Sequence, residues 1–289
     1  MFATSCLVEK SFEIWPGKLS FAAAGGGARE ALDVAMDVAR DLARPVLADA
    51  ELLATGQENV LPRGRAGRIA VETAARFHEA LPQIEFPPSL AAMPGAICDV
   101  IIEGMYDAAQ ASGGADSIVV SLGDVIAVHQ EPGVAGGAGG VAPPLLGEFV
   151  SALGEGVQGG AAIAGSQSAF PTSGPLDIVA VQSKSAAMAG FAAATVADAS
   201  ADAVSVSKGA SPRDRLFAFA WRDHFIAGPA GLVDAELVWQ ALSVSVRQAA
   251  ALRDKRFLRA AALGFKGRGR TTGPVDGDRL LRFGVSEWR

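Results

Sequence analysis

The chain is poor in the residues that build metal centres and disulfide frameworks. It has two cysteines and three histidines among 289 residues. Cys6 and Cys98 are far apart in the sequence, and His78, His129 and His224 do not have the spacing of a zinc site. These absences exclude a recognisable zinc motif and a disulfide-stapled secreted fold. They favour a protein of the reducing cytoplasm.

Basic runs and membrane-length apolar runs are also missing. The net charge of -6 argues against a nucleic-acid binder, because phosphate contacts need a basic surface. Mean hydropathy is +0.28, yet no apolar run free of charges and turn residues reaches the roughly 18 to 20 residues that span a bilayer. We therefore expect a cytoplasmic protein with a small-molecule ligand, no nucleic-acid partner and no membrane segment. Its oligomeric state is left open, a homo-oligomer included.

What the chain does contain is apolar, small-residue sequence. Half of the residues are apolar, 19% are charged and 34 are glycine, which excludes disorder throughout. The patterns alternate between helices and apolar strands, so we predict an α/β fold in which mixed sheets pack against helices. We expect one domain over residues 1–289. An irregular segment rich in glycine and proline, at about 131–160, is expected to be an insertion or a lid.

The stretch from Ala91 to His129 carries the clearest pattern. Met93 to Ala111 predicts a mostly buried helix, with one narrow solvated stripe formed by Asp99, Glu103 and Asp107. An apolar strand with Ile118 to Val120 follows, and it suits a position covered on both faces. Gly123 and Asp124 interrupt this strand. A glycine there indicates a bulge or a close approach, either to a ligand or to another strand.

Several further elements are predicted from periodicity and turn residues. Gly25, Gly26 and Gly27 precede a helix that Pro45 should end, and they form either a phosphate cradle or a plain loop. Asp234 is a candidate cap for a long amphipathic helix. The expected elements are a hairpin at 11–24, helices at 28–44, 69–80, 145–153, 185–195 and 233–253, and strands at 161–173, 216–226 and 259–265, the first of which runs into a Ser-rich turn.

Three stretches together resemble a known family. They are AAMPGA with the strand ending in LGD, DIVAVQSKSAAMAGFAAAT at 177–195, and FLRAAALGFKGRGRTTG at 257–273. In this order they resemble UPF0280, a family related to the ApbE-type FAD:protein FMN transferases, over residues 64–273. The resemblance implies a layered ApbE-like fold with a flavin-type site beside the turn at Ser121 to Asp124.

The resemblance also implies the site residues. Asp124 is the candidate catalytic residue, since a carboxylate can accept hydrogen bonds from a ring or act as a base. The serines and threonines of residues 166–173 would contact the ligand, or would only satisfy turn backbones. The expected cofactor-binding residues are Gly95, Ser121, Gly123, Asp124, Ser166, Ser168, Thr172 and Thr195, with Ser173 as a further polar contact.

One departure from the family bears on metal chemistry. ApbE-type transferases place an Asp that helps to hold Mg²⁺ four residues before the helix threonine, whereas this chain has Phe191 at that position before Thr195. A phenyl ring cannot ligate a hard cation, and Asp198 would lie on a different helical face, so we assign no metal ligands.

Three functional hypotheses follow from these residues. The first is a diverged relative that binds or acts on a flavin, a pterin or a similar heterocycle in cofactor metabolism. The second is a non-catalytic accessory or assembly protein that kept the scaffold. The third is a Mg²⁺-dependent FMN transferase with other metal ligands.

Overall fold

Nine strands form a single sheet whose order follows the chain. The computed structural model describes residues 8–54, 61–134, 139–168, 172–201 and 233–288, so the strand expected at 216–226 lies outside the described residues. Neighbouring strands pair antiparallel, except that β8 and β9 pair in parallel. The strands are β1 Val8–Ile14, β2 Gly17–Ala24, β3 Ser117–Leu122, β4 Val125–Gln130, β5 Gln158–Ala164, β6 Ile178–Ser183, β7 Ala260–Phe265, β8 Arg268–Thr272 and β9 Glu287–Trp288.

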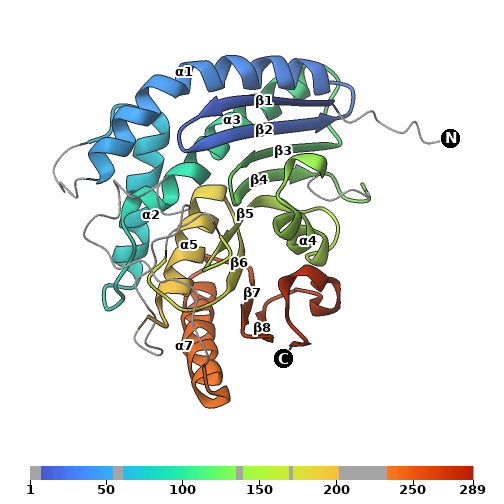
Figure 1. Ribbon diagram of the computed structural model, residues 1–289. Coiled ribbons are helices and arrows are strands. Elements are labelled where there is room, and N and C mark those ends of the chain that lie inside the picture. The colour runs from blue at the N-terminus through green and yellow to red at the C-terminus, as the bar shows by residue number, and fades with distance from the viewer. Residues whose placement is uncertain (1–7, 55–60, 135–138, 169–171, 202–232, 289) are drawn as a thin grey trace.

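Helices cover both faces of the sheet, as Figure 1 shows. Five helices pack on one face and build the larger core, whereas α4 and the C-terminal segment pack on the other face. The predicted α/β class with helices packed on a sheet is therefore confirmed. The described helices are α1 Ala28–Ala54, α2 Arg65–Ala80, α3 Met93–Ala111, α4 Pro144–Ala152, α5 Ala186–Asp198 and α7 Ala235–Asp254, with a short 3-10 helix, η1, at Ser89–Ala92.

Strand alternation explains why the sheet is apolar on both sides. Val120 and Val125 face the larger core, while their neighbours Val119 and Ile126 face the smaller core. Because side chains alternate along a strand, a continuous apolar run can supply both faces at once. The expectation that this strand is covered on both faces is confirmed.

The Gly-Asp step is a turn between two strands, which corrects the predicted interruption of one strand. Leu122 of β3 pairs with Val125 of β4, so Gly123 and Asp124 form a two-residue hairpin loop. Gly123 has φ +59°, a conformation that favours glycine in such loops. A Cβ added at Gly123 would meet no described atom within 4 Å, so the predicted close approach to another strand is wrong, and the predicted approach to a ligand stays a prediction.

Helix α1 runs on to Ala54, so the prediction that Pro45 ends it was wrong. Proline removes one backbone hydrogen bond. The apolar face continues past it, because Leu42, Val46 and Ala50 are all buried in the larger core. Tertiary packing therefore outweighs the local cost of Pro45.

The glycine run before α1 packs against the end of α3. A Cβ on Gly27 would lie 2.4 Å from the carbonyl oxygen of Ala109, and the Gly27 amide donates to the Gly114 carbonyl at 2.7 Å. Of the two predicted alternatives, the plain loop describes this segment better. Its glycines have a packing role as well, since they permit a close crossing of two backbones. That crossing holds α1 against α3.

Three further predictions have clear outcomes. The N-terminal hairpin is confirmed as β1 and β2, and Cys98 is confirmed as a buried residue of α3. Residue 234 stands at the N-cap of α7, but the Asp234 side chain makes no cap hydrogen bond, so that expected cap is absent. The irregular segment at 131–160 contains α4 and the start of β5.

The central helix is apolar enough to raise the question of a membrane. Among the described residues, Ser89–Ala111 is the one helical stretch whose length and composition would allow it to cross a bilayer. Within its most apolar window, 67% is buried inside the protein, as is usual for a central core helix. This burial accounts for its composition without a membrane.

Candidate functional site

The N-terminus of α5 is held by residues from two other elements. Its first two amides, of Ala186 and Ala187, donate to the Asp99 carboxylate of α3 at 2.7 and 2.9 Å. Glycines allow this close approach: a Cβ on Gly95 would lie 2.2 Å from the Ala186 carbonyl oxygen, and one on Gly160 of β5 would lie 2.2 Å from the Ala186 Cα. The helix start is thus clamped between α3 and β5.

Asp99 therefore does not belong to the solvated stripe that the sequence predicted, and that part of the prediction was wrong. Glu103 and Asp107 are exposed on that face, but Asp99 turns inward and caps a helix that lacks an acid in its own first turn. Burial raises the pKa of Asp99 to about 6, although backbone hydrogen bonds from Ala187 and Ala186 lower it. A carboxyl group that titrates near neutrality thus lies at the base of a cleft.

This pKa gives a pH dependence of stability with a definite sign. Because the folded pKa of about 6 exceeds the ordinary value of 3.8, the folded state binds more protons between these two values. The contribution of Asp99 to stability should fall as pH rises through this window, by roughly 1 to 3 kcal/mol. We expect the stability of the wild type relative to Asp99→Asn to decrease between pH 4 and pH 7 in denaturant titrations. An increase would contradict the raised pKa.

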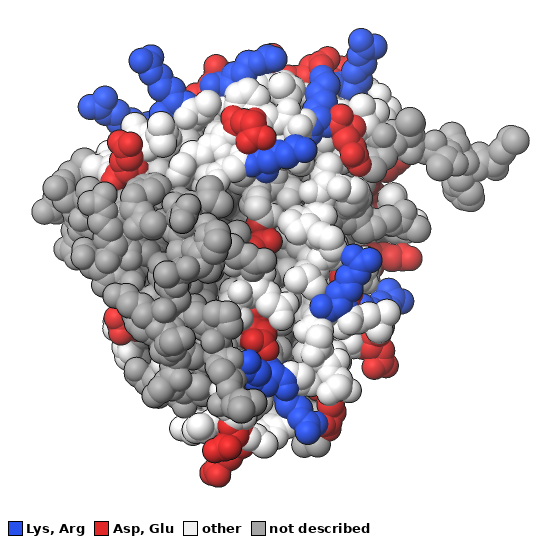
Figure 2. All heavy atoms as spheres, in the orientation of Figure 1, with Lys and Arg blue, Asp and Glu red and all other residues white. Residues whose placement is uncertain are grey.

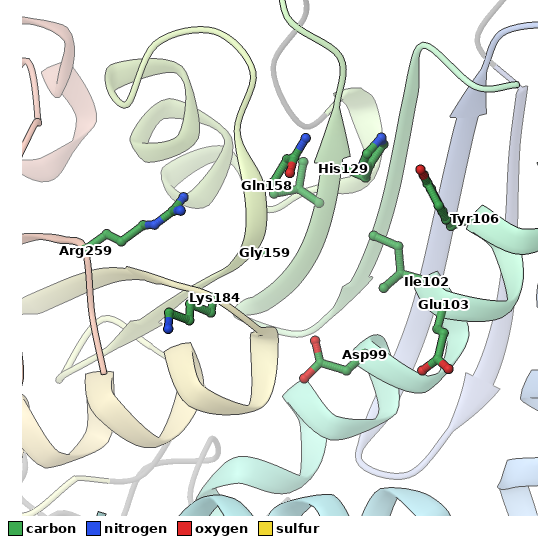
Figure 3. Close-up of a pocket in the computed structure, with 10 residues that line it drawn as sticks. Asp99, Ile102, Glu103, Tyr106, His129, Gln158, Gly159, Lys184 and Arg259 are labelled. Carbon is green, nitrogen blue, oxygen red and sulfur yellow. The ribbon is translucent and has the colours of Figure 1, made fainter. Parts of the chain in front are cut away.

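A cleft of about 480 Å³ opens beside Asp99; we call it the α3 cleft (Figure 3). One wall comes from α3, and the opposite side comes from the ends of the strands and the connections next to them. Figure 3 shows Lys184 and Arg259 together on the side opposite the α3 residues. The lining residues are Asp99, Ile102, Glu103, Tyr106, Val128, His129, Gln158, Gly159, Lys184 and Arg259.

A second cleft, of about 500 Å³, lies toward the other end of α5; we call it the α5–α7 cleft. The α5 helix begins at the α3 cleft and ends here, so the two clefts are separated by its length, about 20 Å. Its polar lining includes Ser173, Thr195, Asp198 and Gln248, and its apolar lining includes Phe86. The other described lining residues are Gln83, Ile84, Glu85, Pro87, Pro88, Ala199, Ala201 and Val244.

Hydrogen bonds fix the polar side of the α5–α7 cleft. The Ser173 amide donates to Oδ1 of Asp198 at 2.6 Å, which ties the segment before β6 to the end of α5. The Thr195 hydroxyl donates to the Phe191 carbonyl at 2.7 Å, so its proton is already used within the helix. The cleft can therefore offer carboxylate and hydroxyl oxygens as acceptors.

Phe191, which the family resemblance would align with the metal-binding Asp of ApbE-type transferases, is completely buried. Its ring meets Phe77 edge-on at 5.0 Å and stacks on Phe86 at 5.8 Å between centroids. The position thus belongs to an aromatic cluster that backs the cleft. Across the described parts of the chain, no three His, Cys, Asp or Glu side chains gather where they could share a metal ion.

The predicted catalytic residue lies at the β3–β4 turn. The Ser168 hydroxyl is 2.9 Å from Oδ2 of Asp124, which brings together two predicted residues that are 44 positions apart. The same hydroxyl is 2.9 Å from the Ile163 carbonyl oxygen, so Asp124 and Ile163 share its single proton. Asp124 does not line the described part of either cleft, and its role as base or ligand contact stays a prediction.

The other predicted cofactor-binding residues are divided among several environments. Of the predicted cofactor-binding residues, Thr195 lines the α5–α7 cleft, and the further predicted contact Ser173 lines it too. Gly95 is packed against α5, Ser121 and Thr172 are buried, Ser166 is half-buried and Gly123 is exposed in its turn. Their cofactor contacts also stay predictions.

Sequence reasoning missed the residues of the α3 cleft. Asp99 was interpreted as solvated, and Tyr106, Lys184 and Arg259 were not singled out. Two signals were present in the sequence: Tyr106 is the only tyrosine of the chain, and the Gly159–Gly160 pair precedes a predicted strand. Neither signal identifies a partner 87 positions away, as with Asp99 and Ala186.

Comparison with protein-family models gives no match, and comparison with curated proteins gives none either. The family resemblance therefore remains an expectation drawn from the three stretches. The face in Figure 2 shows acidic and basic side chains interspersed over the described residues, without a broad basic patch.

Proposed function

We propose that this chain binds a flat heterocyclic cofactor of the flavin or pterin type in the α5–α7 cleft and serves in cofactor metabolism. The observation that carries the proposal is the meeting of Ser173, Thr195 and Asp198 in one cleft of about 500 Å³. The family resemblance names two of these residues, Ser173 and Thr195, as ligand contacts. The volume lies in the range of cofactor sites, which usually run from about 300 to 1,000 Å³.

The chemistry of the lining also supports a flat ring. Phe86, Pro87 and Pro88 supply rigid apolar surface on one side, and a planar ring gains most from such surface. Asp198 supplies a carboxylate, which can accept hydrogen bonds from ring N–H groups or from an exocyclic amine. The described lining is mixed, with six polar and seven apolar residues, so apolar surface can contact the faces of a ring while polar groups bond to its edge.

Replacing Asp198 with asparagine tests this assignment. Asparagine keeps an oxygen that can accept from the Ser173 amide, but it loses the charge that strengthens a bond to a ring N–H. We expect the Kd for riboflavin or 6-methylpterin to rise about tenfold or more in Asp198→Asn. Both probes lack phosphate, so neither depends on a phosphate-binding site. Equilibrium fluorescence titration measures the change.

The matched control is Asp107→Asn, which removes one exposed acid from α3 and should leave the Kd unchanged. If neither ring compound binds the wild type at millimolar concentration, the proposal fails. Asp124→Ala adds a second comparison: unchanged binding in that variant would remove Asp124 from the site.

The second candidate function is the non-catalytic accessory protein. The burial of Phe191 among Phe77 and Phe86 supports it, because the family resemblance aligns Phe191 with the transferase metal ligand. Incubating the protein with FAD, Mg²⁺ and an acceptor protein separates the hypotheses. FMN transfer would exclude the accessory role and favour the third hypothesis, the Mg²⁺-dependent transferase.

A further inference from the structure

We propose that the α3 cleft is a second binding site, for a phosphomonoester whose organic part is aromatic. This site lies at the opposite end of α5 from the α5–α7 cleft and does not depend on the function proposed above. Three features of the cleft support this site: its charges, the backbone that presents them, and the exposed ring of Tyr106.

The charged side chains of the α3 cleft favour binding of an anion. Its acids already have partners: Asp99 accepts two amide hydrogen bonds, and Glu103 forms an ion pair with Arg65 at 2.5 Å. Among the described residues, Lys184 and Arg259 form no ion pair. Two cationic side chains thus face this cleft without a counter-ion, in a chain whose net charge is -6.

Hydrogen bonds fix the backbone next to Lys184 and Arg259. The Arg259 amide donates to the Gln182 carbonyl at 2.8 Å, and the Ser183 hydroxyl donates to the Phe257 carbonyl at 2.5 Å. These bonds hold the two connections side by side. Gly159, at φ +103°, lets the chain at Ser183 cross closely, since a Cβ there would lie 2.3 Å from the Ser183 carbonyl oxygen.

An aromatic surface completes the cleft on the α3 side. Tyr106 is 37% exposed, and its ring meets that of His129 edge-on, with centroids 4.7 Å apart. His129 is fixed from the other side by Glu131, with 3.1 Å between Nε2 and Oε1. A held aromatic ring opposite two cations suits a ligand with an anion at one end and a ring at the other. Two cations favour a phosphate dianion over a single carboxylate.

The test titrates the full chain with phenyl phosphate, inorganic phosphate and benzoate at low ionic strength by calorimetry. We expect phenyl phosphate to bind most tightly, inorganic phosphate more weakly, and benzoate weakest. Lys184→Met combined with Arg259→Met should raise the Kd of both phosphates at least about tenfold. Lys18→Met combined with Arg44→Met removes the same charge from exposed positions elsewhere and should leave both values unchanged.

The ring is tested separately from the anion. Tyr106→Ala should weaken phenyl phosphate by about threefold to tenfold while inorganic phosphate is unaffected, and Tyr106→Phe should retain the wild-type difference. Absence of phosphate binding, or equal loss in the two double variants, would overturn the site. Benzoate binding as tight as phenyl phosphate would overturn the phosphomonoester assignment. Asp198→Asn should leave these values unchanged, so either proposal can fail without the other.

Discussion

Replacing Gly95 with alanine is expected to destabilise the protein by about 3 kcal/mol or more, one of the two largest effects we predict for a single substitution. The added Cβ would lie 2.2 Å from the carbonyl oxygen of Ala186, 2.3 Å from its carbonyl carbon and 2.5 Å from the amide of Ala187. All three are backbone atoms at the start of α5, so rotamer changes cannot relieve the clash. Denaturant titration followed by circular dichroism measures the change in unfolding free energy.

Gly104→Ala is the matched control, because it makes the same change on the same helix. Its new Cβ would meet only Val34 Cγ1 at 3.4 Å and Val38 Cγ2 at 3.5 Å, which is ordinary contact. Alanine has the higher helix propensity by about 1 kcal/mol, so this variant should match or slightly exceed the wild type in stability. Equal effects at Gly95 and Gly104 would contradict the close crossing of α3 and α5.

Replacing Asp99 with alanine should cost about 2 to 4 kcal/mol of unfolding free energy. The substitution leaves the Ala186 and Ala187 amides without their acceptor in a half-buried environment, and each such loss costs about 1 to 3 kcal/mol. It also removes a negative group from the N-terminus of α5. Ser185, whose hydroxyl accepts from the Met188 amide at 3.3 Å, satisfies a different amide and cannot compensate.

Asp107→Ala distinguishes this capping role from a general effect of removing acids from α3. Asp107 is exposed on the same helix and should change stability by no more than about 0.5 kcal/mol. Comparable losses at positions 99 and 107 would show that the Asp99 cap contributes nothing specific.

The fold was predictable from the sequence wherever one local pattern dominates. The β-branched run of β3 and the Ala-rich run of α5 identify a buried strand and a buried helix without tertiary information. The prediction was wrong where tertiary packing opposes the local preference of a residue, as at Pro45, which lies inside α1. It also failed at Gly123 and Asp124, because a two-residue hairpin loop and a break in one strand leave the same sequence trace.

The candidate sites were less predictable, for a physical reason that Asp99 illustrates. Its helical spacing with Glu103 and Asp107 indicates a shared solvated face. Only the crossing of α3 and α5 turns its carboxylate onto two amides 87 and 88 positions away. The family resemblance drew Ser173 and Thr195 into the predicted site and named Asp198 only as a residue on another helical face. The cleft that brings the three together forms only in the folded chain. Lys184 and Arg259 lie within two of the stretches that carry the family resemblance, but the resemblance gives neither residue a role.

The most direct test of the central claim, a flat-ring cofactor in the α5–α7 cleft, is mass spectrometry of the small molecules released when the purified native protein is denatured. The account predicts that the wild type releases a flavin- or pterin-type compound and that Asp198→Asn releases several-fold less of it. A wild-type preparation that releases no compound of this class, or equal release from both proteins, would contradict the assignment.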